Sequence, residues 1–147
     1  MGMKPQKIRP LAICVFRHED RILVAEGRDE IKDETFYRPL GGAIEFGEYA
    51  RDTLVRELRE EIGAEIGDLQ YLGALENVFT YMGEQGHEIV LVFDGAFVDR
   101  AFYRQERIDG NEDGLGAFVA MWKPLSFFEP GPPLYPDGLI DLLKAVI

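Results

Sequence analysis

Two patterns of apolar residues follow one another along the chain, and each predicts a different element. Over residues 50–62 the apolar side chains recur every three or four positions, which places them on one face of an α-helix. The apolar positions of this segment are Ala50, Leu54, Val55, Leu58 and Ile62. Gly63 comes directly after them and predicts a helix end in the left-handed conformation.

Shorter apolar segments, rich in valine, isoleucine and leucine, lie on both sides of this helix and predict strands. We expect strands over residues 8–17, 21–25, 43–45, 69–81, 87–98 and 117–123. Residues 27–35 and 99–116 are charged and contain glycine, so we expect surface loops there. A short helix over 124–128 and a final helix over 138–147, with Asp137 as its N-cap, complete the order. This order predicts an α/β fold, a mixed sheet with helices on two faces.

The composition limits what the chain binds and where it works. Its 147 residues suit a single domain, 1–147, with a full hydrophobic core. The formal net charge of −11 argues against duplex nucleic acid or an anionic membrane surface as a partner. The one cysteine, Cys14, lies in an apolar segment, so we expect a buried, inert thiol and no internal disulfide. Residues 1–10 lack the apolar core of a signal peptide, and no apolar run is long enough to span a bilayer, so we expect a reduced cytoplasmic setting.

Three carboxylates share one arc of the predicted helix. At about 100° per residue, Glu57, Glu60 and Glu61 lie within an arc of roughly 100° beside the apolar stripe. Glu61 lies nearest the stripe, and we expect it to be shielded from water. The three like charges repel one another, and Arg56 offsets only part of this charge by pairing with Glu60. Because Mg²⁺ prefers oxygen ligands, the arc is a candidate metal site; a solvated acidic helix face is the alternative.

The spacing of charged and glycine residues around this arc is specific. Gly42 is followed after five residues by Glu48, and after seven more by the segment RELREEIGA, which ends at Ala64. This arrangement resembles the Nudix box, with Ala64 standing where a larger aliphatic residue is more usual. The resemblance implies a Nudix-type α/β/α sandwich with a mixed sheet, in which the box forms a loop–helix–loop motif. It also implies a metal-dependent pyrophosphohydrolase that acts on a nucleoside diphosphate linked to another group.

The resemblance gives roles to the residues of the box. We expect Glu57 and Glu61 to be the first ligands of Mg²⁺ or Mn²⁺ and Glu60 the third, with one of these carboxylates acting as base on the attacking water. The carbonyl of Gly41 is a further candidate metal ligand. Arg56 is expected to orient carboxylates and not to touch substrate. The residues expected to support the motif are Gly42, Glu48 and Gly63.

Two of the charged residues have open alternatives. Arg38 comes shortly before the glycine pair, and the resemblance places it near the substrate phosphates; a surface salt bridge is the alternative. Glu48 falls at the predicted start of the helix, where the helix dipole favours a carboxylate. The alternative is that Glu48 supports the site through a salt bridge to Arg56.

A distal carboxylate is expected from the acidic segment 99–116, because Mg²⁺ demands more oxygen ligands than one short helix face supplies. Members of the family often add such a residue from a loop before a late strand. The acidic residues considered for this role are Glu106, Asp109, Glu112 and Asp113. We choose Glu112, with Gly110 and Gly114 as hinges; a solvated acidic loop is the alternative.

The sequence leaves the choice of substrate open. Phe79 and Tyr81 are candidate substrate contacts, since a tyrosine seventeen residues after Ala64 resembles its placement in dinucleoside-polyphosphate hydrolases; the alternative is that both residues pack. Dinucleoside polyphosphates, nucleoside triphosphates and nucleotide sugars all remain candidates for this small-molecule nucleotide substrate. The alternative function is a non-catalytic, nucleotide-binding regulatory Nudix module, whose mark would be a damaged box. The resemblance is also compatible with a homodimer.

Overall fold

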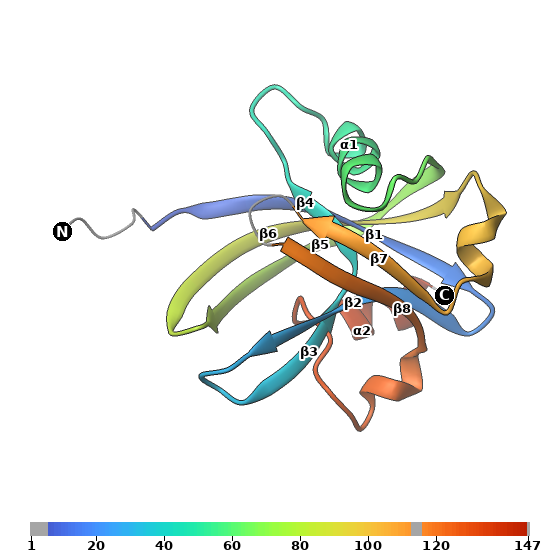
Figure 1. The fold of residues 1–147 in the computed structure, drawn as a ribbon. Helices are drawn as coiled ribbons and strands as arrows, with labels where there is room; N and C mark the ends of the chain where they lie inside the picture. Colours follow the sequence, from blue (N-terminus) through green and yellow to red (C-terminus); the bar gives the residue numbers. More distant parts are fainter. Residues whose placement is uncertain (1–5, 113–115, 147) are drawn as a thin grey trace.

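The structure is a computed structural model and describes residues 6–112 and 116–146 (Figure 1). The strands within these residues are β1 (Ile8–His18), β2 (Arg21–Asp29), β3 (Glu34–Arg38), β4 (Leu40–Ala43), β5 (Ile66–Tyr81), β6 (Glu84–Phe97), β7 (Arg107–Glu112) and β8 (Gly116–Pro124). The helices are α1 (Ala50–Ile62) and α2 (Leu139–Val146), and the 3₁₀ segments are η1 (Arg100–Arg104) and η2 (Leu125–Phe128).

The strands form one mixed sheet that divides into two halves. The order along the sheet is β5-β6-β1-β2-β8-β7, with β4 paired to β1 and β3 paired to β2. β1 and β6 are parallel, whereas β4 and β2 each pair with β1 in the antiparallel direction. The contact of β1 with β2 is confined to the ends beside their turn, at Arg17↔Ile22 and His18↔Arg21. Consequently β3 and β4, which are joined through Pro39, lie on different halves of the sheet.

A helix covers each face of the sheet, which confirms the α/β/α sandwich (Figure 1). On β1, Ala12, Cys14 and Phe16 point into the core beneath α1, whereas Ile13 and Val15 pack on the side of α2. Successive strand residues point to opposite faces, so two covered faces require a continuous apolar run such as this one. The fully buried leucines of the helices are Leu54 and Leu58 in α1 and Leu139 and Leu143 in α2. Burial raises the pKa of the Cys14 thiol well above its usual range, so the expected buried thiol is confirmed.

The central helix follows its sequence pattern closely. α1 spans Ala50–Ile62, and Gly63 ends it in the left-handed conformation with a φ of 67°. Its N-cap is Tyr49, which makes no side-chain capping bond, so Glu48 lies one residue before the cap and not at the helix start. The hydroxyl of Thr53 donates a hydrogen bond to Glu48 Oε1 at 2.6 Å. This bond holds the Glu48 carboxylate against the first turn.

Two segments that were expected to be loops contain strands. Residues 27–35 include the end of β2 and the start of β3, which pair as an antiparallel hairpin. Residues 99–116 include η1 and β7, and β7 pairs with β8 from Arg107↔Met121 to Glu112↔Gly116. Residues 30–33 do form a turn, so the first loop prediction is wrong only at its two ends, whereas the second is wrong over β7. β3 and β7 lie at sheet edges, where polar side chains are favoured. Charge alone does not separate such a strand from a loop.

The short strand expected over 43–45 lies earlier in the chain. β4 begins at Leu40, and its glycines pair with β1 at Gly41↔Ile13 and Gly42↔Ala12. A Cβ on Gly41 would lie 2.0 Å from the carbonyl oxygen of Ala12, so only glycine permits this approach. From the sequence, two adjacent glycines suggest a turn. In the structure they lie on β4 and allow it to pack closely against β1.

The remaining elements agree with expectation apart from shifted ends. β5 begins at Ile66 and continues past Gly73 to Tyr81, and β6 begins at Glu84. The 3₁₀ segment η2 lies where the short helix was expected. α2 begins at Leu139, directly after Gly138, and Ile147 lies outside the described residues. None of the described helices is long and apolar enough to cross a membrane.

Candidate active site

A small cavity lies beside α1, and four of the predicted site residues line it. Arg38 comes from the end of β3, Gly41 from β4, Glu61 from the last turn of α1 and Glu112 from the end of β7. The rest of the lining consists of Ala25, Pro39, Leu40 and Phe118. Segments far apart in the sequence thus bring two carboxylates, one guanidinium and a glycine backbone to one place.

Glu61 is the most buried carboxylate of this group, with 6% of its surface exposed. Its place beside the apolar stripe of α1 confirms that it is shielded from water. Burial is the largest cause that raises the pKa of Glu61 to about 9, and a hydrogen bond with Glu57 and the charges of Glu112 and Glu57 act in the same direction. Arg38 lowers the pKa of Glu61. The protein's own cations therefore compensate only part of the negative charge in the cavity.

Glu57 lies one helical turn before Glu61 and close against β4. A Cβ on Gly42 would lie 2.4 Å from the carboxyl carbon of Glu57, so the glycine leaves room for this side chain. That contact gives a physical reason for glycine at the first position of the box. Glu57 Oε1 also accepts a hydrogen bond from Arg56 Nη1 at 2.7 Å. The Glu57 carboxylate is therefore held between Gly42 and Arg56.

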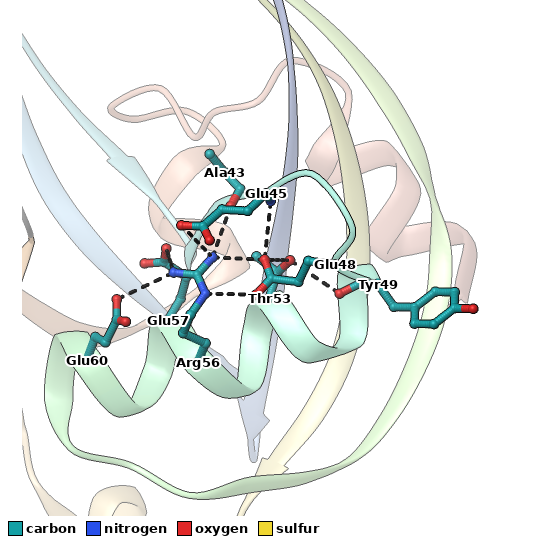
Figure 2. Close-up of polar contacts among 8 residues, drawn as sticks. All are labelled: Ala43, Glu45, Glu48, Tyr49, Thr53, Arg56, Glu57 and Glu60. Carbon is teal, nitrogen blue, oxygen red and sulfur yellow. Dashed lines mark hydrogen bonds and ion pairs between the residues drawn. The ribbon is translucent and has the colours of Figure 1, made fainter.

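Arg56 gathers oxygen atoms beside the first half of α1 in an arrangement that we call the Arg56 cluster (Figure 2). Its members are Ala43, Glu45, Glu48, Thr53, Arg56, Glu57 and Glu60. The guanidinium binds Glu48 through two nitrogens, from Nε to Oε2 at 2.8 Å and from Nη2 to Oε1 at 2.9 Å. Nη2 also donates to the carbonyl of Ala43 at 3.3 Å, and Nη1 lies 3.5 Å from Glu60 Oε2. The Glu48–Arg56 salt bridge considered for Glu48 is therefore present.

Opposite charges stabilise one another in the Arg56 cluster. Hydrogen bonds from Arg56 and then from Thr53 lower the pKa of Glu48 to about 2, and the bond to Glu48 raises the pKa of Arg56. The donors of Arg56 point at oxygens of Ala43, Glu48 and Glu57 (Figure 2), and Arg56 does not line the cavity, which agrees with an orienting role. Glu60 lies at the exposed edge of this cluster, with 54% of its side chain in contact with solvent, and does not line the cavity.

Arg38 and Glu112 form an ion pair across the cavity. Arg38 Nη2 donates to Glu112 Oε2 at 2.6 Å, which joins the end of β3 to the end of β7. Glu112 lies on a strand and not in a loop, and the expected hinge Gly110 is paired with Phe118, whose ring covers it. Gly114, the other expected hinge, and Asp113 lie outside the described residues. Neither Glu106 nor Asp109 lines the cavity.

Phe79 and Tyr81 lie on the β5–β6 hairpin and do not line the cavity. The ring of Phe79 covers Gly86 on the opposite strand. The hydroxyl of Tyr81 donates to the carbonyl of Arg28 at 3.3 Å, and its ring meets Phe36 edge to face. Both side chains thus have packing partners of their own, and the structure does not bring them to the carboxylates.

The donors around the cavity fit a hard divalent cation. Glu61, Glu112 and the backbone of Gly41 line the cavity, and Glu57 lies beside them through its hydrogen bond with Glu61. All of these are oxygen donors, and their charge is only partly compensated. Within the described residues, no three acidic, histidine or cysteine side chains already converge on one point. Glu57 is turned toward Arg56 and Glu112 toward Arg38, so binding an ion requires side-chain rotation.

Sequence reasoning missed Thr53, which is fully buried and holds Glu48 in place. Its only signal is a polar residue next to Leu54, on the side of the helix that faces the core. It also missed the contact of Arg56 with the Ala43 carbonyl, because a backbone acceptor leaves no mark in a sequence.

Comparison with known proteins places this site in a family context. Residues 7–126 match the NUDIX domain family. The NAD-capped RNA hydrolase NudC of Pseudomonas fluorescens is 37% identical over 139 residues, which cover 95% of this chain and 45% of that protein. NudC of Pseudomonas aeruginosa is 29% identical over 126 residues, which cover 86% of this chain and 40% of that protein. The chain thus spans less than half the length of these curated relatives.

Structural similarity extends over almost the whole fold. A NUDIX hydrolase from Nitrosomonas europaea superposes with a TM-score of 0.66 at 16% identity, covering 95% of this chain and 88% of that one. At that identity the likeness shows the fold alone. The family match, however, covers most of the chain and includes the whole box around the cavity. The chain therefore belongs to the Nudix hydrolase family.

Proposed function

We propose that this protein is a Mg²⁺-dependent pyrophosphohydrolase that cleaves a diphosphate linkage in a nucleotide derivative. The observation that carries the proposal is the buried carboxylate of Glu61, which lines one cavity together with Glu112 and is hydrogen-bonded to Glu57. A buried group with two like charges beside it is costly for stability alone, whereas a divalent cation gives all three a favourable partner. Mn²⁺ is the expected substitute for Mg²⁺.

Each residue has a defined task in this proposal. Glu57, Glu61 and Glu112, with the Gly41 carbonyl, would hold the cation, which supplies positive charge against the phosphate oxygens and lowers the pKa of the attacking water. Arg56 positions Glu57 through the 2.7 Å hydrogen bond. One of the cavity carboxylates accepts the proton of the water. Because phosphoryl transfer needs little covalent chemistry from the protein, positioning and charge account for most of the rate.

The substrate is best sought among nucleotides in which a diphosphate joins two groups. The relatives named above are NAD-capped RNA hydrolases, and this chain aligns with them over most of its length. We therefore add NAD and NAD-capped RNA to dinucleoside polyphosphates, nucleoside triphosphates and nucleotide sugars. The net charge of −11 argues against duplex nucleic acid but not against a short capped strand whose phosphates meet a bound cation.

The test is a screen of these compounds with the full chain, with Mg²⁺ and with excess chelator. Chromatography of the nucleotide products identifies the bond that is cleaved. We expect cleavage at a diphosphate linkage that vanishes with chelator and returns with Mg²⁺ or Mn²⁺. Full activity in excess chelator would contradict the metal-dependent reaction. Tight nucleotide binding with no turnover of any compound would favour the regulatory module.

A further inference from the structure

We propose that Arg38 is an exchangeable counterion, which binds Glu112 in the free protein and passes to a substrate phosphate when Glu112 binds a divalent cation. This inference rests on the proposed function and adds an order of events to it. The observation behind it is the 2.6 Å hydrogen bond between Arg38 Nη2 and Glu112 Oε2 at the wall of the cavity.

Arg38 is suited to neutralise the cavity in the absence of metal. Among the described residues that line the cavity, it is the one cation, and it faces the carboxylates of Glu61 and Glu112. A divalent cation bound to Glu112 would bring two positive groups to the same carboxylate. Since like charges at hydrogen-bond distance repel strongly in a partly buried site, the guanidinium and the metal ion compete for Glu112.

The ion pair is built to open. Among contacts to described residues, the Arg38 side chain makes this one hydrogen bond, whereas Arg17 binds Asp94 through two nitrogens at 3.1 and 2.6 Å. The Arg38 side chain is also 41% exposed, so water can replace Glu112 as its partner at small cost. Its other N–H groups make no hydrogen bond to a described residue, and a guanidinium recognises a diphosphate through paired hydrogen bonds.

The first test measures metal binding without any nucleotide. Mn²⁺ is titrated calorimetrically into the parent protein and into Arg38→Met, which keeps an unbranched side chain and removes the charge. We expect Mn²⁺ to bind Arg38→Met about three- to tenfold more tightly, because the competitor is gone. The matched control is Arg28→Met. Arg28 lies on the neighbouring strand β2, has the same 41% exposure and pairs with Asp33 away from the cavity, so its loss should leave Mn²⁺ affinity unchanged.

The second test measures the other half of the exchange. With saturating Mn²⁺, methylenediphosphonate should bind Arg38→Met at least about tenfold more weakly than the parent, since a charge-assisted contact is lost. Glu112→Gln should show the opposite pair of effects: weaker Mn²⁺ binding, but tighter binding of methylenediphosphonate without metal, because Arg38 is free from the start. A fixed structural salt bridge would produce neither effect.

The outcomes separate the exchange from the proposed function. If the parent binds Mn²⁺ and Arg38→Met binds it equally or more weakly, the proposed exchange of Arg38 between Glu112 and phosphate is wrong, but the proposed metal site is not contradicted. If the parent binds no Mn²⁺, the proposed function fails and the exchange fails with it. If Arg38→Met does not fold, Glu112→Gln decides, and an unchanged affinity for metal-free methylenediphosphonate overturns the exchange.

Discussion

The two sides of α1 handle negative charge in opposite ways. In the Arg56 cluster, a guanidinium with several bonds lowers the pKa of Glu48 to about 2. In the cavity, burial and neighbouring carboxylates raise the pKa of Glu61 to about 9. The two groups share Glu57, which accepts from Arg56 and is hydrogen-bonded to Glu61.

Under the proposed function, this difference would separate the residues that build the site from those that take part in the reaction. The Arg56 cluster is complete without any ligand, since each of its charges has a partner within the protein (Figure 2). In the cavity the carboxylates favour a cation, and among the described residues that line it Arg38 is the one cation. Residues of the first group should matter most for stability, and residues of the second group should matter most for turnover.

The largest expected effect is on turnover. Glu57→Gln and Glu61→Gln keep side-chain size but each removes a carboxylate that would bind the cation, so each should lower kcat by about 10²- to 10⁴-fold. Steady-state kinetics with the substrate from the screen measures this loss, and thermal unfolding in chelator should show that both variants fold. The matched control is Glu45→Gln, an exposed carboxylate 3.8 Å from Arg56. Equal losses in all three variants would remove the distinction between the two groups.

The next effect is on stability. Arg56→Met leaves Glu48 and Glu57 without their main partner, and we expect the free energy of unfolding to fall by about 1–3 kcal/mol. Urea denaturation of metal-free protein measures the change. Arg56→Lys should recover less than half of it, because an ammonium cannot reproduce the two-nitrogen contact with Glu48. A variant as stable as the parent would show that the cluster does not support the fold.

Metal binding should stabilise the parent by an amount set by its affinity. At a free Mg²⁺ concentration ten times the dissociation constant, mass action adds about 1.4 kcal/mol to the free energy of unfolding. Denaturation curves with Mg²⁺ and with chelator provide the comparison. Glu61→Gln should lose most of this increment, whereas Glu45→Gln should retain it. An equal increment in both variants would place the bound ion elsewhere.

The smallest effect concerns acid. The pKa of Glu48 is lowered in the folded protein, so its contribution to stability is present above the ordinary carboxyl pKa and is lost as pH falls toward about 2. The stability difference between the parent and Glu48→Gln should therefore be largest above about pH 5 and shrink as the pH is lowered. Denaturation of both proteins at several pH values tests this. A difference that grows in acid would have the wrong sign for a lowered pKa.

The features of the site that could be predicted from the sequence are those that follow from the periodicity of one helix. The spacing of α1, its end at Gly63 and the burial of Glu61 all follow from one helical stripe, and the structure confirms them. The contact between Gly42 and Glu57, which lie in the same box, was not predicted.

The other parts that were not predicted depend on distant segments. Arg38 and Glu112 are 74 residues apart in the sequence, and their pairing follows only from the placement of β3 and β7 at the edges of one half-sheet. The sequence of β7 predicts a loop because Ile108 is its one buried apolar residue, which leaves too weak a hydrophobic pattern to indicate a strand. The backbone acceptor at Ala43 has no side-chain signature at all.

The four polar lining residues of the cavity come from three separated segments, residues 38–41, Glu61 and Glu112, and this has a consequence for the kinetics of folding. Contacts between distant segments require the closure of long loops, so they form late along the folding pathway. The unfolded chain lacks the joined arrangement of Arg38, Gly41, Glu61 and Glu112. A cation that recognises only the joined arrangement should leave the refolding rate nearly unchanged and slow the unfolding rate. In this protein a bound metal ion would then stabilise the fold by slowing unfolding and would not accelerate folding.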